Sequence, residues 1–200
     1  VNEDGLVLDH SLSHYASLDE TNIGGTLTFA LWMNVHSTGN NYQRIFVLGG
    51  PGLTDCIEFN QYMKTGRVYM NIRHGVTYQW SNVHSTNYLT YSLNEWNHMV
   101  IVLNKEDGNV KWYKNGVLDS TLTTTKFPNV MTRYNNFIGS TINGGSSFDG
   151  QIRSLNIWER ALSATEITDL YKLERHISLV RTATVSITIQ DTEYSPDKQV

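Results

Sequence analysis

Short stretches in which hydrophobic and polar residues alternate recur along most of the chain and predict β-strands. The clearest is RVYMNIR, residues 67–73, where Val68, Met70 and Ile72 occupy every second position. Because successive side chains of a strand point to opposite faces, these three residues are expected to face a core and the others to face away. Similar runs, bounded by Gly, Asn, Asp or Ser, lie at 26–35, 43–50, 76–83, 98–104, 109–125 and 135–141. Their spacing predicts a β-sandwich or barrel.

Two of these runs, FALWM and HMVIVL, are apolar on both faces in the middle, which is typical of central strands covered on both sides. Asn115 and Gly116 both tolerate the positive φ that a type I′ turn requires, so WYKNGVL predicts a tight hairpin. With a further turn at Glu106, Asp107 and Gly108, residues 98–125 are expected to form a three-strand meander.

One helix is predicted near the end of this pattern. Ser163 and Glu166 form a capping box, in which each side chain binds a backbone N–H at the start of a helix. Apolar residues follow at helical spacing, namely Leu162, Ile167, Leu170 and Tyr171. A helix from Ser163 to about Leu170 is too short to stand alone, so it is expected to cover an edge or an end of the sandwich.

Residues 172–200 have a different pattern. From Ile177 to Ile189 apolar residues alternate with small polar ones, which predicts one long half-buried strand or two short ones. Such a strand would either pair with the sandwich edge or lead into a neighbouring domain or subunit. The chain is therefore divided into a domain at 1–171 and a C-terminal extension at 172–200.

Composition narrows the possible functions. The 200 residues are 40% hydrophobic, which suffices for one large core. The net charge is -4 and no dense run of Lys or Arg occurs, so a nucleic-acid partner is not expected. No apolar stretch reaches the roughly 18 residues of a membrane span. The single cysteine, Cys56, excludes an internal disulfide and is either a buried thiol or a reactive one.

Several segments together resemble a known family. GLVLDHSLSHYASL, TFALWMNV, WNHMVIVLN, KWYKNGVL, NNFIGS and SFDGQIRSLNIWERALSATEI stand in the order seen in LamG-like, concanavalin A-like jelly-roll domains, over residues 5–171. The resemblance implies an all-β, two-sheet antiparallel sandwich with one concave face and one short C-terminal helix. It also implies an extracellular role in binding glycans or protein surfaces. It does not fix the ligand, because the superfamily also includes enzymes.

The sequence does not favour catalysis. Glycosidases on this fold place two or three carboxylates on alternate residues of one strand, and no such pattern is present. Glu106 and Asp107 are adjacent in a predicted turn. On a strand, His10 and His14 would lie about 13 Å apart, too far to share one zinc ion. We therefore expect a protein that is not an enzyme.

A candidate sugar-binding patch lies on two neighbouring predicted strands. Sugars are held by aromatic rings together with planar amide and guanidinium groups. The outward residues of 67–73 and 76–83 fit this requirement: Arg67, Tyr69, Asn71, Arg73, Tyr78 and Trp80. If the two strands pair around His74 and Gly75, these residues form one patch with two or three exposed ring faces. The alternative is that the three rings pack under a loop or against the other sheet. Weaker candidates are Tyr42, Gln43, Arg44 and Tyr88.

The resemblance also implies a calcium ion, which many relatives carry at the rim or on the convex side. Its carboxylates would be Asp9, in a segment similar to the family's first strand, and Asp149, in Phe148-Asp149-Gly150. Asp9 is followed by His10, where the family often has Gly. Asp149 either binds the ion or caps its own turn. Asp4 and Asp55 are weaker candidates.

The expected function is a non-catalytic, lectin-like module, with calcium as the possible cofactor, that attaches to a glycan surface. The main alternative is a structural or adhesion module of a multidomain surface or virion protein, which binds a protein partner or self-associates through the C-terminal strand. A polysaccharide-degrading enzyme is the third possibility. Each of these functions places the chain outside the cell, on a cell surface or on a virion.

Overall fold

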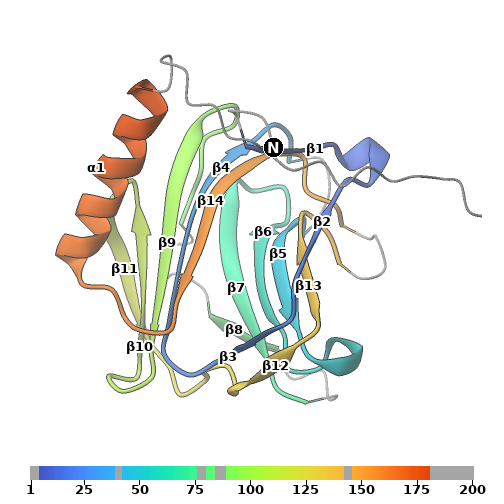
Figure 1. Cartoon of the computed structure of the whole chain (residues 1–200), viewed down its shortest axis with the longest axis vertical. Coiled ribbons are helices and arrows are strands. Elements are labelled where there is room, and N and C mark those ends of the chain that lie inside the picture. The colour runs from blue at the N-terminus through green and yellow to red at the C-terminus, as the bar shows by residue number, and fades with distance from the viewer. Residues whose placement is uncertain (1–4, 39–41, 76–79, 84–88, 142–145, 181–200) are drawn as a thin grey trace, which may run out of the picture.

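The computed structural model describes residues 5–38, 42–75, 80–83, 89–141 and 146–180. These residues confirm the predicted all-β architecture with a helix near the end (Figure 1). The strands are β1 (Leu6–Leu8), β2 (Ala16–Leu18), β3 (Thr21–Ile23), β4 (Leu27–Val35), β5 (Arg44–Gly49), β6 (Ile57–Tyr62), β7 (Arg67–Arg73), β8 (Trp80–Val83), β9 (Trp96–Asn104), β10 (Asn109–Lys114), β11 (Val117–Thr123), β12 (Met131–Arg133), β13 (Asn135–Ile138) and β14 (Gly150–Trp158). The helices are the 3₁₀ turns η1 (His10–Leu12) and η2 (Pro51–Leu53) and the α-helix α1 (Ala164–Val180).

Two six-stranded antiparallel sheets pack face to face (Figure 1). We call the first, β1-β14-β4-β9-β10-β11, the helix-side sheet, because α1 lies on its outer face. We call the second, β2-β13-β5-β6-β7-β8, the far sheet. A small pair, β12-β3, lies beside them. The predicted jelly-roll sandwich is confirmed.

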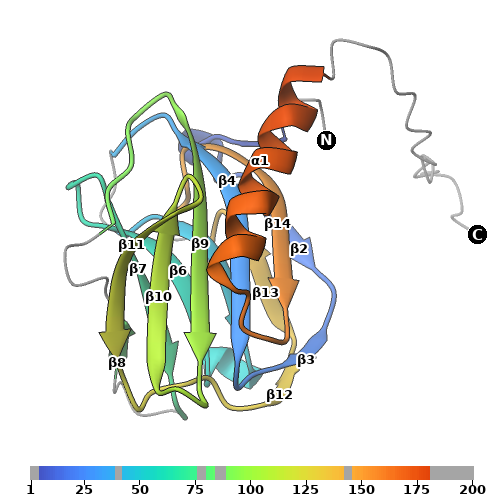
Figure 2. The same ribbon diagram turned by 90° about the vertical axis from the view of Figure 1, so that its left-hand side faces the viewer.

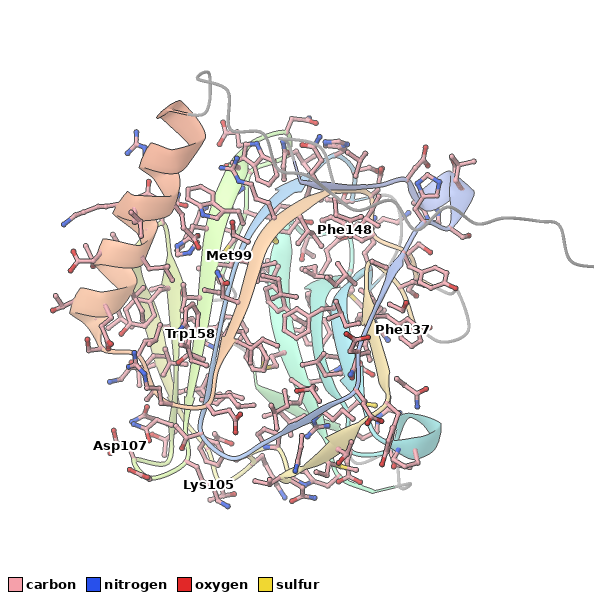
Figure 3. The ribbon with its side chains drawn as sticks, viewed as in Figure 1. Met99, Lys105, Asp107, Phe137, Phe148 and Trp158 are labelled. Atoms are coloured by element: carbon pink, nitrogen blue, oxygen red, sulfur yellow. The ribbon has the colours of Figure 1, made fainter. Side chains whose placement is uncertain are left out.

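The main core fills the space between the two sheets. On β7 the predicted alternation is confirmed, because Val68, Met70 and Ile72 are fully buried in this core. Met99 and Phe148 also point into it, whereas Phe137 of β13 points out of the far sheet toward Tyr15 (Figure 3). Cys56 is buried as well, and burial raises the pKa of its thiol to about 12, so the buried reading of this cysteine holds.

The predicted meander and hairpin are present in the helix-side sheet. Strands β9, β10 and β11 pair in sequence, and Asn115 and Gly116 have φ values of 52° and 78° at the tight turn. Strand β14 alternates imperfectly because a bulge interrupts its pairing with β4 between Arg153 and Asn156. Ser154, within the bulge, has a φ of 53°.

Helix α1 begins with the predicted capping box. Glu166 Oε2 accepts a hydrogen bond from the Ser163 N–H at 2.8 Å, and Ser163 Oγ accepts one from the Glu166 N–H at 3.2 Å. Ile167 packs with Val100, Val102 and other residues of a second apolar cluster. This cluster lies on the outer face of the helix-side sheet, where α1 crosses the strands (Figure 2). The expectation that the helix covers an edge or an end is therefore wrong, because it covers a face.

The helix is also longer than predicted. It continues to Val180, so it crosses the predicted boundary after residue 171, and the expected strand does not begin at Ile177. The physical reason is tertiary contact. Tyr171 stacks on Trp32 with ring centroids 5.6 Å apart, and Glu174 Oε2 accepts a hydrogen bond from Trp32 Nε1 at 2.7 Å. These contacts hold the helical turn after Leu170 on the sheet, so the helix continues past the predicted boundary. The predicted strand beyond residue 180 lies outside the described residues.

Candidate functional site

The far sheet carries a set of polar and aromatic side chains on its outer face, opposite the core. Alternation on β6 and β7 directs these side chains away from the core residues Phe59 and Met70. In register, Asn60 lies between Arg44 and Tyr69, and Glu58 pairs with Asn71. We call the set the Glu58 face: Arg44, Glu58, Asn60, Tyr62, Tyr69, Asn71 and Arg73.

An ion network forms the centre of the Glu58 face. Arg73 Nη2 lies 3.3 Å from Glu58 Oε1, and Arg44 Nε lies 3.8 Å from Glu58 Oε2. Asn71 Nδ2 donates to Glu58 Oε2 at 3.4 Å. Glu58 is almost fully buried, whereas the side chains of Arg44 and Arg73 remain 15% and 17% exposed. The carboxylate thus fixes two guanidinium groups that reach the surface.

Three tyrosines lie beside this network. The ring centroids of Tyr62 and Tyr69 are 5.6 Å apart, and that of Tyr42 is 6.1 Å from Tyr62 and 6.2 Å from Tyr69, all in edge-to-face geometry. Tyr69 is 5% exposed, and burial raises the pKa of its hydroxyl to about 12. Tyr42 and Tyr62 remain half-buried and are therefore the more accessible rings.

Two amides on the face have unused hydrogen-bonding capacity. Asn60 is fully buried, and both its Nδ2 and its Oδ1 have no partner among the described residues. The Oδ1 of Asn71 is also buried and likewise has no hydrogen-bond partner among the described residues. A buried amide without partners costs free energy, so such groups in a folded protein call for a water molecule or a ligand.

The structure brings part of the predicted patch together. Tyr69, Asn71 and Arg73 share the outer face of β7, and β7 pairs with β8 so that Arg73 is opposite Trp80. Arg67 lies at the other end of β7, where its backbone pairs with that of Tyr62 and forms an isolated antiparallel β-bridge with that of Thr90. The prediction of an exposed ring at Tyr69 is wrong, because Tyr42 and Tyr62 pack against it.

Not all of the predicted site residues can be placed in the structure. Tyr78 and Tyr88 lie outside the described residues, as does the side chain of Trp80. Glu58, Asn60 and Tyr62 were not among the predicted site residues. The signal was present, since IEFNQY alternates as RVYMNIR does, with Ile57 and Phe59 in the core. Strand β7 has no acidic residue, and its neighbour β6 adds one carboxylate, Glu58, to the same outer face.

The two carboxylates predicted to bind calcium lie just outside two paired strands, Asp9 after β1 and Asp149 before β14. Leu8 pairs with Gly150, so Asp9 and Asp149 lie one residue beyond the same register position. Asp9 caps η1, because its Oδ1 accepts hydrogen bonds from the Ser11 N–H at 2.8 Å and from Ser11 Oγ at 2.6 Å, which lower the pKa of the carboxyl. The backbone N–H of Asp149 donates to Gln43 Oε1 at 3.2 Å. Within the described segments, no three His, Cys, Asp or Glu residues are grouped to hold a metal ion.

Comparisons with known proteins agree with this fold. The sequence profile of the family described as the concanavalin A-like lectin/glucanases superfamily matches residues 9–168. A search of curated proteins found no match.

Among solved structures, the chain resembles the CBM40 domain of the Ruminococcus gnavus IT-sialidase bound to α2,3 sialyllactose (TM-score 0.61, 17% identity, 79% of this chain and 96% of that one). It also resembles domain 4 of the Geobacillus stearothermophilus arabinanase AbnA in complex with arabinotriose (TM-score 0.59, 18% identity, 78% of this chain and 71% of that one). A third is the binding domain of botulinum neurotoxin serotype G (TM-score 0.58, 17% identity, 80% of this chain), of which the chain spans 40%. At these identities the likeness shows the shared fold.

Proposed function

Since the family profile covers most of its length, the chain belongs to the concanavalin A-like lectin/glucanase superfamily, and we propose that it is a non-catalytic carbohydrate-binding module. The observation that carries the proposal is the Glu58 face. This face lies on the opposite side of the sandwich from α1 and combines half-buried tyrosines, two fixed guanidinium groups and a buried amide to which the described part of the chain offers no partner.

The chemistry of the Glu58 face suits a saccharide. A tyrosine ring offers a flat surface to the C–H groups of a sugar, and amides and guanidinium groups offer paired donors to its hydroxyls. Asn60 can donate and accept at once, as a pair of neighbouring hydroxyls requires. Because Glu58 already holds Arg44 and Arg73 in place, a ligand would meet groups that need little ordering on binding.

The structural neighbours support binding rather than catalysis. Two of them are in complex with saccharides, one sialylated and one an arabinose trimer. Glycoside hydrolysis usually requires two carboxyl groups about 5 to 10 Å apart. Of the residues that form the Glu58 face, Glu58 alone carries a carboxylate, and this carboxylate is buried in the ion network. We therefore assign the face a binding role.

Calcium forms part of the proposal. Asp9 and Asp149 are the two carboxylates that would hold the ion, because they lie beside the same register position at the end of β1 and β14. Calcium takes six to eight oxygens, so backbone carbonyls or water would complete the shell. Asp9 Oδ1 already caps η1, so Oδ2 is the oxygen that we propose as the calcium ligand.

The module is proposed to act outside the cell, where glycans are displayed and where its relatives are commonly found. In the described part of the chain, no helix has the length and apolar character needed to span a membrane. The proposed role is attachment of a larger protein to a glycan surface.

A glycan array, run with calcium and again with EDTA, tests the proposal, and the sharpest variant is Asn60→Leu. Replacing a buried amide without partners by an apolar side chain should keep or raise the melting temperature, whereas glycan binding should be lost. The matched control is Asn34→Leu on the helix-side strand β4, which removes another buried amide oxygen that has no partner within the described segments. Unchanged glycan binding by Asn60→Leu would show that Asn60 does not contact the ligand.

A further inference from the structure

Positive charge is concentrated around the Glu58 face. The chain as a whole has a net charge of -4, but residues 57–94, which include β6, β7 and β8, contain three basic residues, Lys64, Arg67 and Arg73, and one acid, Glu58. Strand β5 adds Arg44. An acidic protein thus has a basic region where its proposed ligand binds, and a basic region attracts anionic ligands.

The ion network shows where this surplus lies. Glu58 is shared between two guanidinium groups, Arg44 and Arg73, and its Oε2 is also engaged by Asn71. One carboxylate therefore faces two positive charges in a largely buried setting. Removing charges from water is costly unless they are balanced, so a second carboxylate would complete an alternating arrangement of two cations and two anions.

The saccharide neighbours differ in charge, since sialyllactose carries a carboxylate and arabinotriose is neutral. The residues of this chain favour the first kind. We propose that the ligand of the Glu58 face is an acidic saccharide whose sugar carboxylate binds to Arg44 and Arg73, beside Glu58. This inference rests on the proposed carbohydrate-binding function and narrows it to one ligand class. Planar guanidinium groups suit a carboxylate because they can donate two parallel hydrogen bonds to it.

The test compares each acidic saccharide with a version from which only the charge is removed. Sialyllactose and an oligogalacturonate are titrated into the full chain by calorimetry, each beside its methyl ester, with lactose and arabinotriose as neutral probes. The acidic forms should bind roughly tenfold to a hundredfold more tightly than their esters, as expected for hydrogen bonds to a charged group. Their affinity should also fall as salt is added.

Variants assign the effect to the two arginines. Arg44→Gln and Arg73→Gln should each remove most of the preference for acid over ester, whereas Arg44→Lys should keep part of it. The matched control is Lys105→Gln, which removes one positive charge from an exposed side chain in the β9–β10 turn (Figure 3). Thermal melts report whether each variant folds. If a Gln variant does not fold, the comparison of acid and ester on the unchanged chain still tests the proposal.

The outcomes separate this inference from the function on which it rests. Equal binding of acids, esters and neutral sugars would overturn the acidic ligand and leave the carbohydrate-binding module intact. Binding of sulfated glycans without binding of carboxylated ones would overturn the carboxylate class. Failure to bind any glycan, acidic or neutral, would overturn both proposals.

Discussion

One glutamate lies at the outer face of each sheet, Glu174 of α1 on the helix-side sheet and Glu58 of β6 on the far sheet, and the two have different kinds of partner. On the helix-side sheet, Glu174 accepts hydrogen bonds from Trp32 Nε1 at 2.7 Å and Asn156 Nδ2 at 3.1 Å. On the far sheet, Glu58 lies between Arg44 and Arg73. The partners of Glu174 come from within the fold and lie under α1, whereas those of Glu58 reach the surface.

If the Glu58 face binds a glycan as proposed, the difference explains how one architecture has a closed face and a receptive one. Helix α1 supplies the helix-side sheet with apolar cover, including Ile167, and with its own acid, Glu174. The far sheet carries two guanidinium groups at one carboxylate, and the buried amide of Asn60, which has no partner among the described residues. The sequence thus provides a permanent partner for one face and leaves the other face with groups that suit an added ligand.

The largest expected effect tests the closed face. Ile167 is fully buried between α1 and the sheet, so Ile167→Ala should lower the free energy of unfolding by about 2 to 5 kcal/mol. Leu173 lies on the same helix but is 60% exposed, so Leu173→Ala should have little effect. Chemical denaturation of the two variants measures the difference. Equal small losses would mean that α1 is not required to cover this sheet.

The second prediction concerns pH. His98 is fully buried next to Trp32 and Tyr171, and burial lowers the pKa of its imidazole to about 4. Glu174 Oε2 lies 3.5 Å from Nε2, which favours the charged imidazole, but burial is the dominant influence at a site with no solvent exposure. Between pH 6.5 and 4 the unfolded chain binds a proton that the folded chain does not. His98 should therefore lower the free energy of unfolding by about 3 kcal/mol as the pH falls through this range.

Glu174 opposes this trend. Burial raises the pKa of its carboxyl, so the folded chain holds that proton to a higher pH than the unfolded chain, and stability falls as pH rises through this window. Unfolding measured at a series of pH values should show a smaller acid loss for His98→Phe than for the unchanged chain. The exposed His14 provides the control, since His14→Phe should keep the full loss. If His98→Phe has the same profile, other groups cause the acid sensitivity.

The third prediction tests the receptive face. Tyr62 is one of the more accessible rings of the Glu58 face, so Tyr62→Ala should weaken glycan binding by about 1 kcal/mol, or roughly fivefold in Kd. Tyr134 is 55% exposed outside that face, and Tyr134→Ala should bind normally. Titration with a glycan identified on the array measures both. Tyr69→Ala, in contrast, is expected to lower stability, because the Tyr69 ring is buried under Tyr42 and Tyr62.

The outward residues of β7 could be predicted from the sequence because alternation fixes which side chains share a face. The Glu58 network could not, because it depends on which strands are neighbours and in what register. β6 was not identified as a strand, although its alternation is as clear as that of β7. The length of α1 escaped prediction for the same reason. Tyr171 and Glu174 of α1 contact Trp32 of β4, which is far away in the sequence, so no local pattern reveals the contact.

The smallest expected effect concerns calcium, the second ligand proposed for this fold besides the glycan of the Glu58 face. Asp9 and Asp149 each lie one residue beyond the pair Leu8 and Gly150, at the end of the register between β1 and β14. If they hold calcium, the ion stabilises the folded chain by mass action, by about 1.4 kcal/mol when its concentration is tenfold above the Kd. Asp149→Ala should then lower the melting temperature by a few degrees in calcium and leave it unchanged in EDTA. The control is Asp107→Ala, at an exposed carboxylate in the β9–β10 turn that binds Asn104 Nδ2 and should behave alike in both conditions. An equal loss for Asp149→Ala with and without calcium would make Asp149 a turn residue, and the proposed role of an added ligand would then be confined to the Glu58 face.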